Sequence, residues 1–317
     1  MRAIRWVACV VAAMGVVSGA WAQEAPAAAK PAAGGAIELK VNFTPGMYVV
    51  TKDVTMHVDT AGDRPTVSQI HTAMLMDMEV SKPDEQGNRE LTVTYRQIKF
   101  DQKHGDQSTT YDSSAGASAE QVPPVAKMFE GMVGKKVTVT LDSQGKVSRI
   151  TGVDEMIASM LQSAGMDERA AEGLKQQFGD RIAEETFGQL LIMPGKPVSR
   201  GDSWEVDKQV ELPVLGAVQY KQVLTLKDVK DGVATVAVKG TLRSVGGKAG
   251  AHPAAPSMMV NELTVEGTTL MDIATGMAKR SDVTQKGSLT LTAGEGEEKK
   301  ETKITLNGTA KTTIEKK

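Results

Sequence analysis

Residues 47–80 read MYVVTKDVTMHVDTAGDRPTVSQIHTAMLMDMEV and decide the fold class. Valine, threonine and methionine are abundant in residues 47–59 and 67–80, and charged side chains are few. The six residues between these runs, TAGDRP at 60–65, have the composition of a turn. The pattern predicts two long antiparallel strands joined as a hairpin.

Three methionines alternate with other residues at the end of this hairpin. Met74, Met76 and Met78 are separated by the single residues Leu75 and Asp77, and the acidic Glu79 follows them. Successive side chains of a strand point to opposite faces, so the three methionines share one face. We expect that face to meet the helices on the concave side of a sheet, with residues 75, 77 and 79 facing away.

Further strands are predicted on both sides of a helical region. The two-residue period is lost at 120–131 and 154–193, where apolar residues recur at helical spacing, and Pro194 ends the helical pattern. Asn307-Gly308 predicts a hairpin turn between the last two strands. The predicted strands after the first hairpin are 91–100, 137–141, 146–150, 204–212, 218–229, 233–245, 259–272, 277–291, 302–306 and 309–314.

The fold class predicted from these patterns is mainly β with some α. We expect two similar curved antiparallel sheet units, with short helices packed on the concave face. An internal duplication is suggested because Thr138–Asp142 and Thr268–Asp272 each end a strand in aspartate before a glycine-containing turn. The expected divisions are a signal peptide at 1–22, a disordered Ala/Pro-rich leader at 23–36, a first β unit at 37–152, a helical segment at 153–196 and a second β unit at 197–317.

The N-terminus has the plan of a signal peptide. Arg2 and Arg5 precede an apolar stretch at 6–17, and Ala20-Trp21-Ala22 is a small-residue cleavage site. The stretch is too short for a membrane-spanning helix, which needs about 20 residues. We therefore expect export by the general secretory route, cleavage after Ala22, a periplasmic or secreted location and no transmembrane segment afterwards. Cleavage would remove Cys9, the chain's single cysteine.

Four short motifs resemble a known protein family. They are Phe43-Thr44-Pro45-Gly46, Tyr111-Asp112-Ser113, the segment from Gly134 to Val147, and the segment from Pro197 to Trp204 with its Gly-Asp-Ser-Trp end. In these motifs the chain resembles exported bacterial proteins known as an uncharacterised domain of unknown function. That family has no assigned activity, so the resemblance implies architecture and location alone. The expected curved sheet with helices across it is also similar, at the level of the fold, to periplasmic lipoprotein carriers.

Composition and motifs argue against several classes of function. The formal net charge of −2 disfavours a basic nucleic-acid-binding protein, and 40% hydrophobic residues disfavour a disordered chain. No nucleophile with a base, metal-ligand set or carboxylate pair stands out. We therefore expect no nucleic-acid partner, no catalytic residue, no cofactor and no enzymatic activity.

The histidines suggest one pairing, which is too small to be a metal site. If the first hairpin turns near Arg64, residues whose numbers sum to 128 face each other, which places His57 opposite His71. Asp59 would lie on the same face. No third ligand follows from the sequence, so no metal site is predicted.

Methionine is the more informative residue type. The candidate ligand-binding residues are Met74, Met76, Met78, Met156 and Met160. Such methionines serve as ordinary core, as adaptable lining of an apolar pocket or as ligands for Cu(I). The favoured hypothesis is an exported soluble carrier for an apolar or lipid-like ligand. The alternative is a structural or protein-interaction module of the cell envelope, with envelope proteins as partners.

Overall fold

The computed structural model describes residues 35–61, 65–115, 124–165, 179, 193–212, 216–245, 257–293 and 300–317. The predicted signal peptide and most of the predicted leader lie outside the described residues. So does most of the predicted helical segment beyond residue 165.

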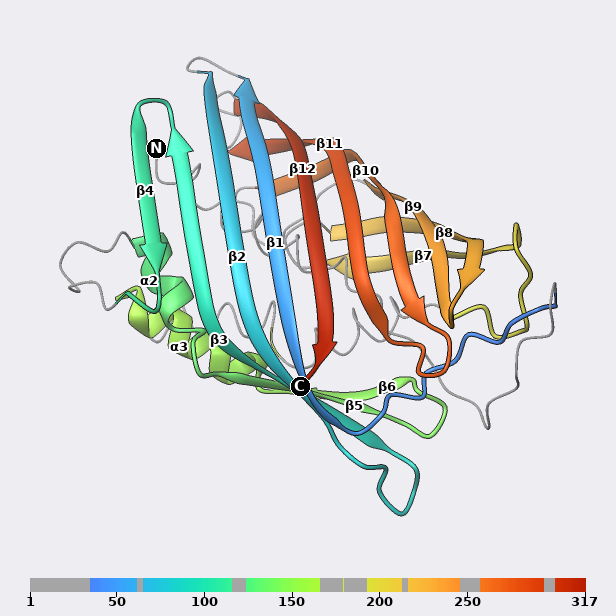
Figure 1. Ribbon diagram of the computed structural model, residues 1–317. Helices are drawn as coiled ribbons and strands as arrows, with labels where there is room; N and C mark the ends of the chain where they lie inside the picture. The colour runs from blue at the N-terminus through green and yellow to red at the C-terminus, as the bar shows by residue number, and fades with distance from the viewer. Residues whose placement is uncertain are drawn as a thin grey trace.

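The described part of the chain contains one antiparallel sheet of twelve strands (Figure 1). The strand order is β6-β5-β3-β2-β1-β12-β11-β10-β9-β8-β7, and β4 pairs with β3 outside this path. The prediction of a mainly β protein with few helices is therefore confirmed. The strands are β1 (Gly46–Ala61), β2 (Thr66–Val80), β3 (Arg89–His104), β4 (Gln107–Asp112), β5 (Lys136–Leu141), β6 (Val147–Thr151), β7 (Ser203–Leu212), β8 (Gly216–Lys230), β9 (Val233–Ser244), β10 (Ser257–Asp272), β11 (Ala278–Ala293) and β12 (Lys300–Lys316).

The two β regions of the chain are joined within this one sheet. The first strand, β1, pairs with the last strand, β12, from Tyr48 opposite Lys316 to Ala61 opposite Lys303. The turns after β5 and β10 share one feature, since a glycine donates a backbone hydrogen bond to the aspartate carbonyl in both, but Gly145 is three residues after Asp142 and Gly276 four after Asp272. The internal duplication itself stays a prediction.

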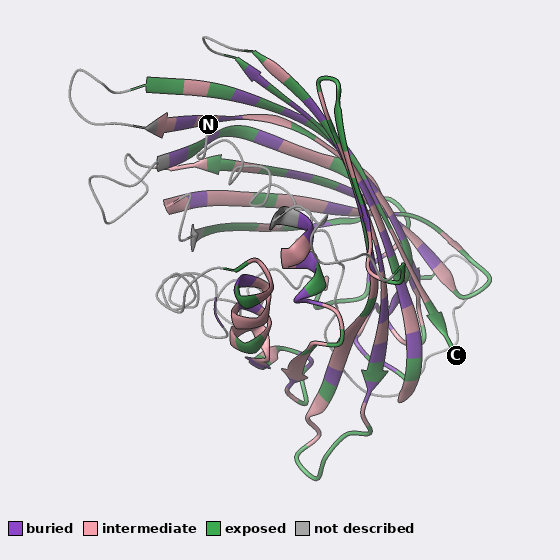
Figure 2. Ribbon diagram, turned by 90° about the vertical axis from the view of Figure 1, so that its left-hand side faces the viewer, coloured by how far each residue is buried: buried purple, intermediate pink, exposed green. Residues whose placement is uncertain are grey.

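The sheet is curved, and its apolar side chains lie on one face. Along β2, every even-numbered residue from Ser68 to Val80 is buried, and the residues between them are half-buried or exposed. Figure 2 shows the two helices inside the curve of the sheet. Phe129 of α2 lies against buried Phe100 of β3, with ring centroids 5.1 Å apart. We call this buried, concave side the inner face and the opposite side the outer face.

The described helices are short and pack against each other. They are α2 (Pro124–Glu130) and α3 (Val153–Ser163). α2 contacts β3, and α3 contacts β5. A Cβ atom at Gly131, just after α2, would lie 2.5 Å from the Met160 Cα atom of α3, so glycine permits this close approach.

The segment before β1 forms a strap across one end of the sheet. Within residues 35–44, which we call the strap, the side chains at 37, 39, 41 and 43 are buried, and those between them are exposed or half-buried. Ile37 and Val198 exchange two backbone hydrogen bonds of 2.8 Å, and Asn42 donates another, also 2.8 Å, to the Thr275 carbonyl. The strap therefore runs from the start of β7 past the β10–β11 turn.

The predicted hairpin turn at Asn307-Gly308 is wrong. β12 runs without interruption through both residues, and Gly308 lies opposite Met56 of β1. A Cβ atom at Gly308 would lie 2.7 Å from the Thr55 carbonyl oxygen and 2.8 Å from the Met56 sulfur. The glycine therefore serves a close approach of neighbouring strands and not a change of chain direction.

Candidate functional site

The three methionines of β2 all belong to the inner face. Met74, Met76 and Met78 are 8%, 7% and 0% exposed, and each belongs to the main apolar cluster. Leu75 and Asp77 between them are half-buried on the outer face. The alternation in the sequence therefore separates the two faces as expected.

The structure brings all five candidate methionines into one apolar cluster. Met156 and Met160 lie on α3, half-buried, and pack against the cluster that contains the β2 methionines. Six more methionines join this cluster that are not among the sequence candidates, although Met132 stands four residues after Met128 and Met258 directly precedes Met259. They are Met56, Met132, Met193, Met258, Met271 and Met277.

These eleven methionines make the interior chemically unusual. The chain has 17 methionines but only 12 phenylalanine, tyrosine and tryptophan residues together. Methionine is unbranched and polarizable and can fit irregular apolar shapes, whereas branched and aromatic side chains impose a shape of their own. The inner face is therefore suited to contact apolar groups of different shape.

A row of polar side chains crosses the middle of the inner face. Lys52 of β1 is 8% exposed, and it lies opposite Thr312 of β12. Thr312 lies opposite Ser281 of β11, which lies opposite Thr269 of β10. The Ser281 and Thr269 hydroxyls are hydrogen-bonded at 3.1 Å, and both residues are at most 4% exposed. We call these four residues the polar row.

Burial perturbs the ammonium group of the polar row. Desolvation disfavours the charged form and lowers the pKa of Lys52 to about 8. Sequence reasoning missed Lys52, although the alternation of β1 contained a signal. Lys52 stands two residues from Val50 and two from Val54, so its side chain points to the same buried face as theirs. A lysine on the buried face of a strand is uncommon and indicates either a partner or a function.

The predicted pairing of His57 with His71 is wrong. Cross-strand partners in this hairpin sum to 126, so His57 lies opposite Gln69 and His71 lies opposite Thr55. On the outer face, the His71 Nε2 atom lies 3.0 Å from an oxygen of Asp53. No group of three or more metal-ligating side chains suited to a metal ion occurs among the described residues.

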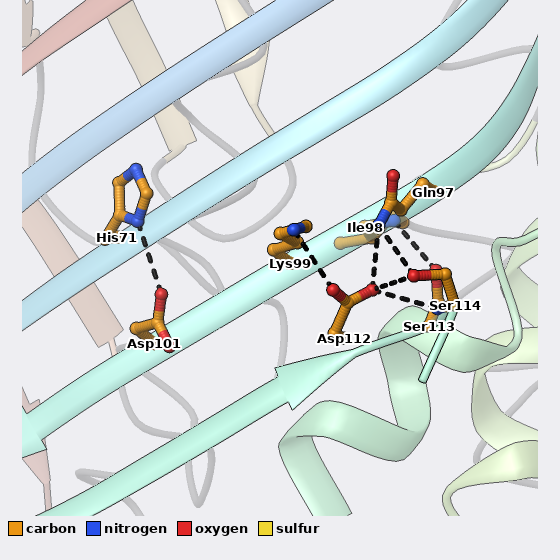
Figure 3. Close-up of polar contacts among 8 residues, drawn as sticks. All are labelled: His71, Gln97, Ile98, Lys99, Asp101, Asp112, Ser113 and Ser114. Carbon is orange, nitrogen blue, oxygen red and sulfur yellow. Dashed lines mark hydrogen bonds and ion pairs between the residues drawn. The ribbon is translucent and has the colours of Figure 1, made fainter. Parts of the chain in front are cut away.

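His71 is held between carboxylates of the two neighbouring strands. Its Nδ1 atom lies 3.4 Å from an oxygen of Asp101 on β3, and Figure 3 draws this contact. Asp53 of β1 approaches the other ring nitrogen. The hydrogen bond to Asp53 is the main cause that raises the pKa of His71, because the protonated ring donates from both nitrogens. The arrangement ties β1, β2 and β3 together on the outer face.

We expect this contact to make stability depend on pH. The folded-state pKa of His71 is raised above that of the unfolded chain, so its stabilising contribution is complete below about pH 6.5 and is lost as the pH rises through the folded-state pKa. The His71→Gln variant should therefore lose more stability relative to wild type at about pH 6 than at about pH 8.5. Urea denaturation at the two pH values measures this difference. Equal losses for His71→Gln at both pH values would contradict the expectation.

A second polar cluster fixes the end of β4. The Asp112 carboxylate accepts hydrogen bonds from Gln97 at 2.9 Å and from the Ser114 hydroxyl at 2.7 Å, and it pairs with Lys99 at 3.1 Å (Figure 3). The Gln97 hydrogen bond, with those from Ser114, holds the pKa of Asp112 well below its usual range. Ser113 exchanges hydrogen bonds with the Ile98 backbone. The Tyr111-Asp112-Ser113 motif is therefore a structural corner.

Two other motifs singled out in the sequence are also structural corners. The Asp142 carboxylate accepts hydrogen bonds of 2.9 and 2.8 Å from the backbone of Gln144 and Lys146 in the β5–β6 turn. The Asp202 carboxylate accepts a 2.8 Å hydrogen bond from the Ser199 backbone just before β7. Their chemistry is that of turn formation.

No helix in the described part of the chain is long and apolar enough to cross a membrane.

Several solved structures show limited similarity. A structure of lipovitellin, concerned with its lipid–protein interactions, is 12% identical with a TM-score of 0.45, and the match covers 86% of this chain and 25% of lipovitellin. The chain thus spans about a quarter of the length of that protein. Pseudomonas aeruginosa OccK7 is 5% identical with a TM-score of 0.25, over 84% of this chain and 98% of OccK7. Salmonella typhi OmpF in complex with daunomycin is 6% identical with a TM-score of 0.21, over 84% of this chain and 97% of OmpF.

Sequence comparison is more specific. No curated protein matches the chain. The profile of a family of unknown function, DUF6263, matches residues 86–278, which is more than half of the chain. The matched region includes the Tyr111, Asp142 and Asp202 corners described above. The chain therefore belongs to the DUF6263 family, a family of unknown function.

Proposed function

We propose that the protein is an exported binding or carrier protein that holds an apolar or lipid-like molecule against the inner face of its sheet. The observation that carries the proposal is the convergence of eleven methionines on one apolar cluster. Methionine side chains are unbranched and adaptable, so such a lining can follow an irregular apolar shape. The proposal is for binding and not for catalysis, and its export rests on the signal-peptide pattern of residues 1–22.

The dimensions of the sheet support this proposal. The central strands β1, β10, β11 and β12 are 16 or 17 residues long, which corresponds to about 50 Å of extended chain. The two described helices have 7 and 11 residues, or roughly 10 and 16 Å. Their main strand contacts are with β3 and β5, at one side of the sheet. The central strands are thus roughly three times as long as α3, the longer described helix.

One observation favours the alternative, a structural or protein-interaction module of the cell envelope. β7 pairs with β8 alone among the described strands, so its ten residues form an edge of the sheet. An edge strand can accept a strand from another protein. Charged residues along β7, such as Glu205 and Asp207, make such pairing less favourable, and this is why we place the alternative second.

The carrier proposal predicts saturable binding of an uncharged apolar probe. The mature chain should bind Nile red with a blue-shifted, enhanced fluorescence, and dodecanol should displace the dye because both occupy the inner face. Fluorescence titration measures both steps. A protein that is folded by circular dichroism but shows no saturable dye binding would contradict the proposal.

A titration with Cu(I) tests whether the methionines instead serve as copper ligands. If the inner face were a copper site, Cu(I) would raise the melting temperature by mass action. Under the carrier proposal Cu(I) leaves the melting temperature unchanged, and dodecanol raises it.

A further inference from the structure

The strap differs from the strands of the sheet in how it is held. Backbone hydrogen bonds join it to the rest of the described chain at residue 37, through the bridge with Val198, and at residue 42, through Thr275. The strand that follows it, β1, is instead paired residue by residue with β2 on one side and β12 on the other. The attachment of the strap therefore depends more on its side chains than on its backbone.

The side chains that attach the strap are apolar and face the interior. They are 1% to 6% exposed and belong to the same apolar cluster as the methionines of the inner face, and they are Ile37, Leu39, Val41 and Phe43. Burial of apolar surface has no directional requirement, so an apolar guest can cover the surface that these side chains cover. A full ladder of backbone hydrogen bonds could not be replaced in this way.

The strap crosses one end of the sheet at close range. A Cβ atom at Gly276, in the β10–β11 turn, would lie 2.0 Å from the Lys40 carbonyl oxygen, and Figure 1 shows the strap passing this turn on its way to β1. Gly46, where the strap meets β1, has a φ of 146°, a conformation that favours glycine. Residues at the ends of elements that adopt unusual backbone angles can serve as hinges.

The interior of the protein is closed in this structure. Met74, Met76 and Met78 are at most 8% exposed, so a guest molecule reaches the apolar cluster when a covering segment moves aside. The strap lies outside the path of the twelve strands, so it can leave while the pairing of the sheet stays intact.

We propose that the strap is a displaceable lid, and that an apolar guest binds by taking the place of the strap side chains on the apolar cluster. The closed and open forms are then two states of one equilibrium, which the guest shifts because it binds the open form better. This inference names how the proposed function is regulated and rests on it, since it requires that the inner face binds an apolar molecule.

A disulfide between residues 37 and 198 tests the lid. These residues exchange both backbone hydrogen bonds, an arrangement that places Cα atoms about 5.5 Å apart, within the range of a disulfide. The chain's own cysteine, Cys9, lies in the predicted signal peptide, so Ile37→Cys/Val198→Cys supplies the thiols of the mature chain. The oxidised form should bind Nile red at least about tenfold more weakly than the same protein after reduction, because the contact area of one large apolar side chain corresponds to that factor.

The single variant Val198→Cys gives a readout that does not depend on the dye. Val198 is 1% exposed, so its thiol should react slowly with a disulfide reagent such as DTNB in the free protein. Saturating dodecanol should speed this reaction at least about tenfold, because release of the strap exposes the residue. Leu161→Cys is the matched control, since Leu161 is also 1% exposed but lies in a separate cluster on α3, and its rate should stay slow.

The outcomes separate the lid from the carrier function. Equal affinities of the oxidised and reduced forms for Nile red would overturn the lid and leave the carrier function standing. Saturable dodecanol binding without faster reaction of Val198→Cys, or with an equal acceleration of Leu161→Cys, would do the same. If wild-type protein binds neither Nile red nor dodecanol, the carrier function fails and the lid with it. Should the double variant not fold, the reaction of Val198→Cys decides.

Discussion

Replacing Gly267 with alanine should lower the free energy of unfolding by about 3 kcal/mol. Gly267 lies on the inner face of β10, where a Cβ atom would lie 2.2 Å from the Asp282 carbonyl oxygen and 2.7 Å from the Val283 Cα atom of β11. Both are backbone atoms, so the two strands must move apart to admit a methyl group. Urea denaturation of the purified variant measures the loss.

A second inner-face glycine provides the matched control. Gly240 lies on β9, and its nearest neighbour for a new Cβ atom is the Lys221 carbonyl oxygen at 3.4 Å, an ordinary contact. Gly240→Ala should therefore change the free energy of unfolding by less than about 1 kcal/mol. Equal losses for Gly267→Ala and Gly240→Ala would show that the close approach of β10 and β11 is not real.

Truncation of Met78 should cost about 2–5 kcal/mol, as for other fully buried large-to-small substitutions. Met78 is 0% exposed and lies in the main apolar cluster. Leu75, three residues earlier on the same strand, is half-buried on the outer face. Leu75→Ala should cost about 1 kcal/mol or less, because less apolar surface is lost from contact.

The comparison of these two variants tests which face of β2 is the interior. Chemical denaturation of Met78→Ala and Leu75→Ala under the same conditions measures the two losses in the free energy of unfolding. A larger loss for Leu75→Ala would mean that the face assignment, and with it the placement of Met74 and Met76, is wrong.

Most strands of this protein could be predicted from local sequence patterns. Two-residue alternation predicted the first hairpin and the burial of the β2 methionines, because one face of an antiparallel sheet meets the core while the other meets water. The start of α3 was visible from the change of period near residue 153. Each of these features depends on residues that are close in the sequence.

Features that depend on contacts between residues far apart in the sequence could not be predicted in this way. Asn307-Gly308 has the composition of a tight turn, but pairing of β12 with β1 and β11 keeps both residues in a strand. The register of the first hairpin differs from the predicted one by two residues, because the loop geometry and not the composition fixes which residues face each other. The single sheet itself depends on pairing the first strand with the last.

The candidate site was predicted in part. Alternation predicted the β2 stripe, and helical spacing indicated Met156 and Met160, but the isolated methionines of other strands converge only through the sheet register. Lys52 was detectable in principle, because it alternates with the apolar residues on the buried face of β1. Its hydroxyl neighbours were not, since Thr312 and Ser281 are brought beside it by strands from the far end of the chain.

The most direct test of the central claim is the NMR spectrum of the methionine methyl groups, recorded as dodecanol is added. Assignment by single Met→Leu variants distinguishes Met74, Met76 and Met78 on the inner face from Met47 and Met259, which are 38% and 49% exposed. If the inner face binds the apolar chain, the signals of the three β2 methionines shift in a saturable way and those of Met47 and Met259 stay in place. Shifts confined to Met47 and Met259, or no saturable shift at any methionine, would contradict a binding surface on the inner face.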